Sequence, residues 1–408
     1  MNLTKRRWLV LAASCILNLC IGSLYAWSVF AQPMAEHLST VTGTVISSLA
    51  IVFTVANSVG PISMIAGGAV NDRLGPRGVI ILGGTMFGAG MILSGFSSSV
   101  PMLLITYGLG VGLGLSFVYG CTVSNTVKFF PDKRGFAGGI TTASYGLGSV
   151  VVPPIANALN NAVGITAAFK IIGAVIIVVV FLLSRFIIRC PANFAPDGWT
   201  PSDAEAITSR PEKNWLQMLT DPVFYSMILM LCCGAFSGMM IISQASPVAQ
   251  QMIGMSPSSA AIAVSVLAMF NTAGRLLAGA LSDKLSSITT LRIFFVLSAA
   301  GSCLLAFSGT GDIWKFYSGI AAIGLGFGAI MGIFPGFTAA QFGTKNNSVN
   351  YGIMFIGFAA AGFFGPTIMT CIHASQGQYQ GAFLVAILLA AVGLLFSAFY
   401  VVLAKKQS

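Results

Sequence analysis

The chain has 408 residues, of which 56% are hydrophobic and 7% are charged, and its mean hydropathy is +0.89. Soluble domains carry about 25% charged residues, so this composition excludes a soluble globular protein and predicts one that crosses a membrane several times. The formal net charge of +10 is typical of nucleic-acid-binding proteins, but the distribution of the basic residues argues against that class.

The sequence contains twelve apolar segments that are long enough to cross a bilayer, which takes about 20 residues in a helix. They predict an all-α polytopic membrane protein. In chain order they are 8–32, 44–70, 78–98, 101–127, 136–160, 166–188, 222–250, 257–281, 290–309, 313–338, 347–372 and 379–403.

The basic residues predict the orientation of these segments. With the N-terminus in the cytoplasm, 17 of the 20 Lys and Arg residues fall on the cytoplasmic side, and only Lys170 and Lys315 fall at outer ends. This bias follows the positive-inside rule. We therefore expect a multi-pass protein of the cell (inner) membrane with both termini in the cytoplasm. The remaining basic residue, Arg275, lies inside the apolar segment 257–281.

The longest polar stretch divides the chain into two halves. It covers residues 189–221 and separates six apolar segments from the other six. We predict an N-terminal six-helix bundle over 1–188, a cytoplasmic linker over 189–221 and a C-terminal six-helix bundle over 222–408. A short amphipathic helix is expected in the linker near Trp215.

The two halves repeat short motifs at nearly constant distance. "GGAVNDRLG" around Asp72 matches "AGALSDKLS" around Asp283, which lies 211 residues later. "YGLGSVVVPP" around Pro153 matches "FAAAGFFGPT" around Pro366, which lies 213 residues later. The shared distance indicates a duplicated six-helix unit, an arrangement that places a substrate site at the bilayer midplane between the halves.

Several motifs resemble those of known transporters. "GGAVNDRLGPR" resembles the G-x-x-x-D-R-x-G-x-R loop of the major facilitator superfamily. "NTVKFFPDKRGFAGGITTASYGLG" (125–148) resembles the fourth-to-fifth-span region of the oxalate:formate antiporter family, which is related to the monocarboxylate transporters, and "LYAWSVF", "GRLLAGALSDKL" and "NYGIMFIGF" match the same family. The resemblance covers both halves. It implies twelve transmembrane helices in two pseudo-symmetric six-helix bundles and transport by alternating access.

Arg275 is the strongest candidate for a substrate-binding residue. A charge at this depth costs at least ~2.5–3.5 kcal/mol. Helical side chains lean toward the helix N-terminus, so Arg275 leans toward the bilayer middle, which argues against snorkelling to the cytoplasmic surface. An unseen structural partner is the other alternative. Because a guanidinium donates two parallel hydrogen bonds to a carboxylate, we expect a carboxylate substrate.

Phe358 bears on the number of carboxylates in that substrate. The resemblance implies a second cation, a lysine on the eleventh span, and alignment places Phe358 at its position. A dianion would leave one charge unmatched in a dry site, which is costly. We therefore expect a small monocarboxylate such as lactate, pyruvate or formate, with its apolar end against Phe358. The alternative is an oxalate:formate-type dicarboxylate exchanger.

Three tyrosines and an asparagine complete the predicted substrate site. Tyr119 and Tyr145 occupy positions where the resemblance implies substrate-contacting tyrosines. Tyr25 belongs to a polar stripe on the first span that can either line a cavity or join helices. Proton-coupled monocarboxylate transporters usually carry an aspartate at the position of Asn271, four residues before Arg275. Because an amide cannot titrate, anion exchange and proton symport both stay open.

A cluster of charges at the cytoplasmic helix ends predicts a gate. In this interpretation the charges pair when the cytoplasmic side is closed and separate when the halves rock apart, whereas the alternative is simple topological anchoring. The predicted gate residues are Asp72, Arg73, Arg77, Asp132, Lys133, Arg134 and Asp283.

Other classes of function fit the sequence less well. No cluster of buried His, Asp, Glu or Cys suggests an enzyme, a cofactor or a metal site. The eight cysteines form no CxxC pair and are expected to be small core residues. A facilitator or exporter of neutral solutes leaves Arg275 without a partner, and a transporter-like carboxylate sensor lacks a recognisable signalling segment. The expected partners are a monocarboxylate anion, a proton or counter-anion, and the lipid bilayer, with no nucleic acid.

Overall fold

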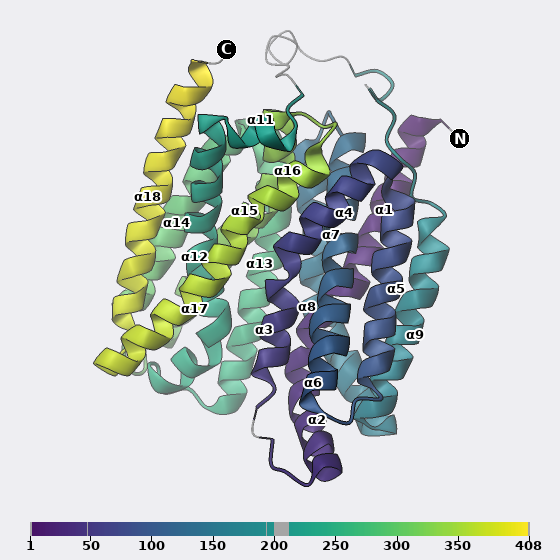
Figure 1. The fold of residues 1–408 in the computed structure, drawn as a ribbon. Helices are drawn as coiled ribbons and strands as arrows, with labels where there is room; N and C mark the ends of the chain where they lie inside the picture. Colours follow the sequence, from purple (N-terminus) through teal and green to yellow (C-terminus); the bar gives the residue numbers. More distant parts are fainter. Residues whose placement is uncertain (1, 47, 193, 200–211, 407–408) are drawn as a thin grey trace. The chain divides into compact units, whose positions relative to one another are not determined.

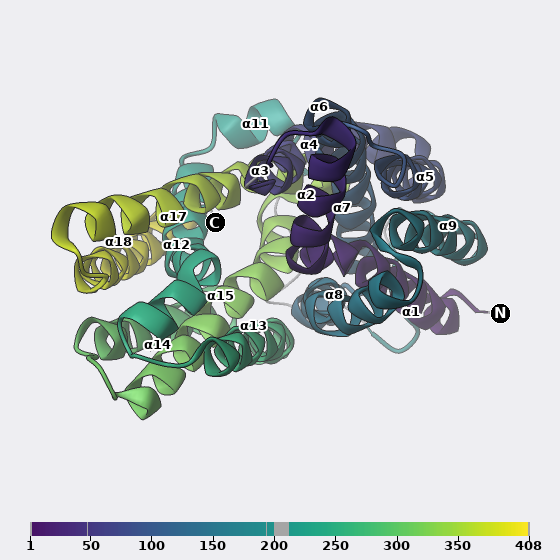
Figure 2. The same ribbon diagram turned by 90° about the horizontal axis from the view of Figure 1, so that it is seen from below.

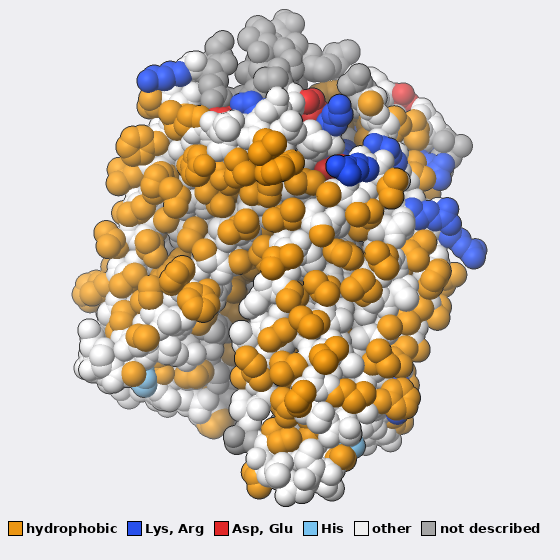
Figure 3. Space-filling view, viewed as in Figure 1, with side chains coloured by type: hydrophobic (Ala, Val, Ile, Leu, Met, Phe, Trp, Pro, Cys, Tyr) orange, Lys and Arg blue, Asp and Glu red, His pale blue; other side chains and the backbone are white. Residues whose placement is uncertain are grey.

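The structure is a computed structural model that describes residues 2–46, 48–192, 194–199 and 212–406, apart from the side chains of Tyr25 and Ser28. These residues form helices and no strand, which confirms the all-α prediction. Among them, eleven helices are long and apolar enough to cross a membrane. Figure 3 shows apolar side chains over most of the helix surface, with Lys and Arg side chains gathered toward one end of the helices.

The helices follow the predicted segments in chain order (Figure 1). The first half contains α1 (Leu3–Ile21), the 3-10 turn η1 (Gly22–Ala26), α2 (Trp27–Thr42), α3 (Ala50–Ser58), α4 (Gly60–Leu74), α5 (Pro76–Ser94), α6 (Val100–Leu103), the π-helical stretch η2 (Leu104–Val111), α7 (Gly112–Phe129), α8 (Arg134–Val163) and α9 (Ile165–Ser184). The second half contains α11 (Trp215–Leu219), α12 (Pro222–Gln251), α13 (Pro257–Leu285), α14 (Ser287–Ala306), α15 (Ile313–Phe342), α16 (Asn347–Met354), α17 (Ile356–Gln376) and α18 (Gln380–Lys405).

Capping residues explain where several helices begin. Asp221 accepts a hydrogen bond from the Val223 N–H at the start of α12, and Ser256 accepts one from the Ser259 N–H at the start of α13. In each case a proline follows the cap, where its fixed φ suits the first helical turn. The linker helix expected near Trp215 is α11, which begins with a capping box formed by Asn214 and Gln217.

Two predicted segments differ from the helices that form there. The segment 8–32 was expected to end at Gln32, but α2 continues to Thr42 and ends at Gly43, whose φ of 69° lies in the left-handed region. The ten residues after Gln32 mix polar and apolar side chains, so hydropathy does not mark the end of the helix and only the glycine does. The helix α8 contains Pro153 and Pro154 and many Gly, Ser, Thr and Asn residues, and it is not among the eleven helices that are long and apolar enough to cross a membrane. With α8 included, the helices correspond to all twelve predicted segments.

The helices pack into two compact units. Unit 1 comprises Met1–Pro131, Ser144–Trp199 and Lys345–Ile353, and unit 2 comprises Asp132–Ala143, Thr200–Thr344 and Met354–Ser408. The start of α8 therefore packs within unit 2, and α16 packs within unit 1.

Each unit has its own central helices. In unit 1, α5 packs against α7 and α9, and α1 and α4 pack against α7 (Figure 2). In unit 2, α13 and α14 pack against α15, and α12 packs against α17 and α18.

Candidate functional site

The Arg275 side chain is buried in unit 2 and contacts only neutral acceptors. The residue is 2% exposed. Its Nε donates to Asn271 Oδ1 at 3.2 Å, and its Nη1 donates to the backbone carbonyl of Thr142 in α8 at 2.8 Å. Within the described part of the chain, no carboxylate forms an ion pair with this guanidinium. The positive charge is thus hydrogen-bonded but not neutralised.

Glycines on both sides of α13 hold Arg275 in this position. A Cβ at Gly139 of α8 would lie 2.5 Å from the Arg275 carbonyl oxygen, and one at Gly332 of α15 would lie 2.4 Å from the same atom. A Cβ at Gly328 would lie 2.0 Å from the carbonyl oxygen of Asn271. These backbones approach closer than any side chain permits, so α13 is fixed between α8 and α15.

Phe358 lies in an aromatic cluster of unit 2. Its ring stacks on Phe355 with centroids 4.5 Å apart, and its centroid lies 6.2 Å from that of Phe327 in α15. Phe327 precedes Gly328, so α15 carries both the cluster and the close contact with Asn271. The position expected from the resemblance to hold a lysine therefore lies beside two aromatic rings.

The predicted tyrosines come together in unit 1. The rings of Tyr119 in α7 and Tyr145 in α8 are 5.1 Å apart, and both residues are buried. Beside them, Asn18 Nδ2 donates to Thr122 Oγ1 at 2.9 Å, and Thr122 Oγ1 donates to the Tyr119 carbonyl at 3.0 Å. The backbone of Tyr25 belongs to η1, but its side chain lies outside the described residues.

Asp72 connects α4, α7 and α16 within unit 1. Its Oδ1 forms a 2.9 Å ion pair with Lys128 Nζ, and its Oδ2 accepts a hydrogen bond from the Val349 N–H in the first turn of α16 at 3.2 Å. Lys128 is a partner that the sequence analysis did not include. A carboxylate at a helix N-terminus is favourable because it meets unpaired N–H groups and the positive end of the helix dipole.

Asp283 makes the equivalent contact within unit 2. Its Oδ1 accepts from the Gly135 N–H at 2.7 Å, and its Oδ2 accepts from the Phe136 N–H at 2.8 Å, at the start of α8. The two motifs that match in sequence thus play matching roles, since each places a carboxylate at the first turn of another helix. The predicted charge pairing is replaced here by hydrogen bonds to backbone N–H groups.

The other predicted gate residues differ in their surroundings. Arg73 and Arg77 are exposed and take part in no ion pair among residues that the structure describes. Lys133 is exposed, and Asp132 and Arg134 are partly buried at the start of α8.

Sequence reasoning missed several polar residues at these sites. Thr142 acts through its backbone carbonyl, which no sequence pattern can reveal. Ser348 accepts from Asn71 Nδ2 at 2.7 Å and lies 2.8 Å from Ser124 Oγ, next to the Asp72 contact. The signal available for this group was the position of Asn71 beside Asp72 in the repeated motif. No group of three or more His, Cys, Asp or Glu residues in the described ranges could hold a metal ion.

Comparison with known proteins identifies the family. The model of the Major Facilitator Superfamily matches residues 8–366. The chain belongs to the Major Facilitator Superfamily. Within it, the chain is 28% identical to the oxalate:formate antiporter of Oxalobacter formigenes over 94% of this chain and 89% of the relative. It is 29% identical to the MFS-type transporter YhjX of Escherichia coli, over 88% of this chain and 86% of the relative. It is 26% identical to rat monocarboxylate transporter 2, over 91% of this chain and 78% of the relative.

Solved structures of superfamily members share the fold. The transporter FucP in an outward conformation aligns with a TM-score of 0.73 and 16% identity, over 96% of this chain and 98% of FucP. A double tryptophan mutant of XylE aligns with a TM-score of 0.76 and 15% identity, over 96% and 94%. These alignments confirm the predicted superfamily fold.

Proposed function

We propose that this chain is a secondary active transporter of small monocarboxylates, of the lactate, pyruvate or formate type, that works by alternating access. The observation that carries the proposal is the buried Arg275 guanidinium, which no carboxylate among the described residues neutralises. Leaving a buried charge unpaired is expensive, so a site of this kind is best explained by an anion that binds during function.

The hydrogen bonds of Arg275 leave one guanidinium nitrogen without an acceptor among the described residues. Nε and Nη1 have protein acceptors, whereas Nη2 donates to none of the residues described by the structure. A carboxylate can bind at the Nη2 edge and exchange with one of the two neutral acceptors, which gives a two-point contact. The similarity to proteins named oxalate:formate antiporter and monocarboxylate transporter supports a carboxylate as the substrate.

The aromatic cluster around Phe358 supports a single charge on the substrate. Phe327 and Phe355 lie beside the position where a second cation would be needed for a dicarboxylate. An alkyl or hydroxyalkyl end fits this apolar surface better than a second carboxylate, which would lose its hydration without gaining a partner.

The neutral contacts of Arg275 favour anion exchange as the coupling mechanism. Neither the Asn271 amide nor the Thr142 carbonyl can neutralise the cation by accepting or releasing a proton. An empty carrier would have to reorient with a buried net charge, so a substrate anion should accompany each passage. Proton symport is the second candidate because the Tyr119 and Tyr145 hydroxyls, or the substrate carboxylate itself, could carry a proton.

The helix-end contacts of Asp72 and Asp283 support a gate on the side that we infer to be cytoplasmic, with both chain termini on that side of the cell membrane. Each carboxylate fixes the start of another helix through backbone N–H groups. We infer that these contacts form in one state of the transport cycle and break in the other.

Uptake into proteoliposomes tests the proposal. The purified full-length protein is reconstituted, and uptake of labelled lactate, formate and oxalate is measured with and without an internal anion and a pH gradient. We expect monocarboxylate uptake that requires internal anion and responds little to the gradient, with poor uptake of oxalate. Uptake driven by external acid without internal anion would support symport instead, and absence of carboxylate uptake under all conditions would overturn the proposed function.

A further inference from the structure

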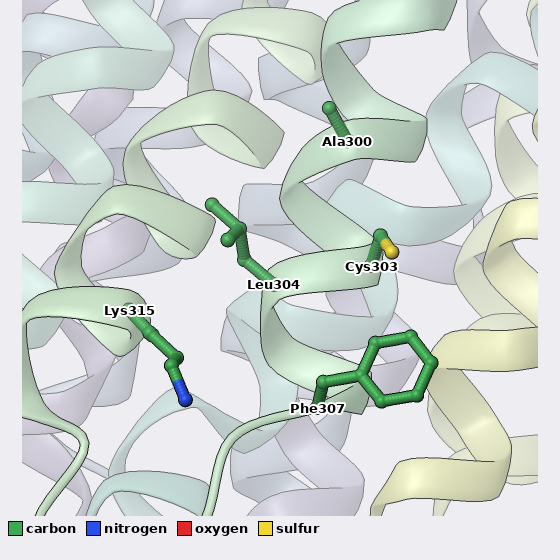
Figure 4. A pocket seen from close by; sticks show the side chains of 5 residues that line it. All are labelled: Ala300, Cys303, Leu304, Phe307 and Lys315. Atoms are coloured by element: carbon green, nitrogen blue, oxygen red, sulfur yellow. The ribbon is translucent and has the colours of Figure 1, made fainter.

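A shallow apolar cavity, largely open to the surface, lies at the end of α14 and the start of α15 in unit 2. It has a volume of about 380 Å³ and is lined by Ala300, Cys303, Leu304, Phe307 and Lys315. Figure 4 shows Ala300 on one turn of α14, Cys303 and Leu304 on the next turn, Phe307 after the end of the helix, and Lys315 on α15. The lining is almost entirely apolar, and Lys315 is the one charged residue among the lining residues.

Lys315, which lines the cavity, forms an exposed ion pair with Asp312. Lys315 Nζ lies 2.9 Å from Asp312 Oδ2, and the two side chains are 37% and 36% exposed. The same Oδ2 accepts the Gly309 N–H at 3.0 Å, so Oδ1 of Asp312 and two ammonium hydrogens of Lys315 stay available among the described residues. The hydrogen bond from Lys315 holds the pKa of Asp312 below its usual value, so the carboxylate stays ionised at neutral pH.

The surrounding residues are typical of a membrane–water interface. Phe307 and Trp314 lie close in sequence to the ion-paired residues, and each is 71% exposed. Aromatic rings are enriched where lipid headgroups meet the hydrocarbon.

We propose that this cavity binds a phospholipid with an ethanolamine headgroup. An acyl chain occupies the apolar part, a phosphate oxygen accepts from Lys315 Nζ, and the primary ammonium of the lipid donates to Asp312 Oδ1. The two opposite protein charges match the two opposite headgroup charges. Phosphatidylglycerol has no cation for Asp312, and the quaternary ammonium of phosphatidylcholine has no N–H to donate. The proposal concerns lipid binding and does not depend on the identity of the transported substrate.

Native mass spectrometry of the full-length protein tests the lipid preference. The protein is mixed with equal amounts of phosphatidylethanolamine, phosphatidylglycerol and phosphatidylcholine, and the retained lipid is measured. We expect preferential retention of the ethanolamine lipid and a roughly tenfold loss of that affinity in Lys315→Gln, as expected for loss of a charge-assisted hydrogen bond. Asp312→Asn should retain phosphatidylglycerol as well as the ethanolamine lipid. Lys170→Gln, which removes the other basic residue at an expected outer end, should behave like the unchanged protein.

Two exposed cysteines provide a second readout. Cys303 lines the cavity, whereas Cys371 is an exposed cysteine of α17 and does not line it. In bilayers that contain the ethanolamine lipid, alkylation of Cys303 by N-ethylmaleimide should be slower than in phosphatidylcholine alone, while Cys371 should react equally in both. Ala300→Trp, which fills the cavity without changing charge, should abolish retention of the lipid. Equal retention of the three lipids, together with equal Cys303 alkylation in both bilayers, would overturn the proposal.

Discussion

At the scale of single residues, Asn271 determines the charge of the Arg275 site. Its Oδ1 lies 3.2 Å from Arg275 Nε, so an aspartate at this position would form an ion pair with the guanidinium without a change of size. Asn271 accepts the hydrogen bond from Arg275 but carries no negative charge. The coupling mechanism should therefore depend on whether the second δ atom of residue 271 is the nitrogen of an asparagine or the oxygen of an aspartate.

We expect Asn271→Asp to reduce anion exchange and to make uptake depend on external acid. The new carboxylate neutralises Arg275 in the empty carrier and must be protonated, or move aside, for a substrate anion to bind. Uptake of labelled monocarboxylate without internal anion, compared at acidic and neutral external pH, measures the effect. Asn271→Gln, which keeps a neutral amide, is the control. Exchange in Asn271→Asp at the original rate and without pH dependence would contradict the expectation.

Phe358→Lys should allow a dicarboxylate to bind. The lysine adds a cation within the ring cluster of Phe327 and Phe355, so the second carboxylate of oxalate gains a partner. The measurement is inhibition of monocarboxylate exchange by oxalate, which should become stronger by about tenfold for one added charge-assisted hydrogen bond. Phe358→Met is the neutral control. Unchanged inhibition would show that Phe358 does not set the selectivity.

At the scale of helices, the close approach of α13 and α15 positions the site. Gly328→Ala would place a Cβ 2.0 Å from the carbonyl oxygen of Asn271, so α15 must move away. We expect a loss of ~1–3 kcal/mol of stability, the usual cost of overpacking, together with reduced transport. Thermal unfolding in detergent measures the loss of stability. Gly78→Ala in α5, where a Cβ meets nothing within 4 Å, should be neutral or stabilising; equal unfolding temperatures for the two variants would argue against a tight α13–α15 contact.

Asp283 should stabilise the first turn of α8. In Asp283→Asn one of the two oxygens that accept the Gly135 and Phe136 N–H groups becomes an NH2 group that cannot accept, and the negative charge at the helix start is lost. We expect this to weaken the helix start by up to ~2 kcal/mol. Hydrogen exchange of the peptide that contains these two amides should become faster. Lys284→Gln changes the neighbouring charge and should leave their exchange unaltered. If the Gly135 and Phe136 amides of both variants exchange hydrogen at the same rate as in the unchanged protein, Asp283 does not stabilise the start of α8.

At the scale of the whole molecule, the sequence predicts the spans better than their packing. Apolar runs that start at Pro222 and Pro257 locate α12 and α13 because length, hydropathy and capping agree there. Hydropathy does not show that α8 changes from one compact unit to the other after Ala143, because the helix itself is continuous.

The candidate sites likewise contain features that the sequence predicts and features that it does not. Arg275, Asn271 and the matching Asp72 and Asp283 motifs are visible as residue types in unusual positions. The carbonyl of Thr142 and the N–H groups at the starts of α8 and α16 are backbone atoms, which every residue has. The cysteines were predicted as core residues, yet Cys303 and Cys371 are exposed, because an apolar segment does not reveal which of its faces contacts lipid.

The central claim is that Arg275 binds the carboxylate of the transported anion. Arginine and lysine differ in their ability to bind a carboxylate at two points, so Arg275→Lys and Arg275→Gln separate geometry from charge. Arg292, which donates to Ser397 Oγ at 2.8 Å and to the Ser397 carbonyl at 3.1 Å, provides a matched arginine elsewhere in unit 2.

The most direct test is exchange of labelled monocarboxylate for internal anion in proteoliposomes of these variants. The account predicts that Arg275→Gln loses exchange by about 100-fold or more, as expected for removal of a buried charge-assisted pair. Arg275→Lys should keep a small fraction of the exchange, and Arg292→Gln should keep most of it. Exchange by Arg275→Gln at the rate of the unchanged protein would contradict the account.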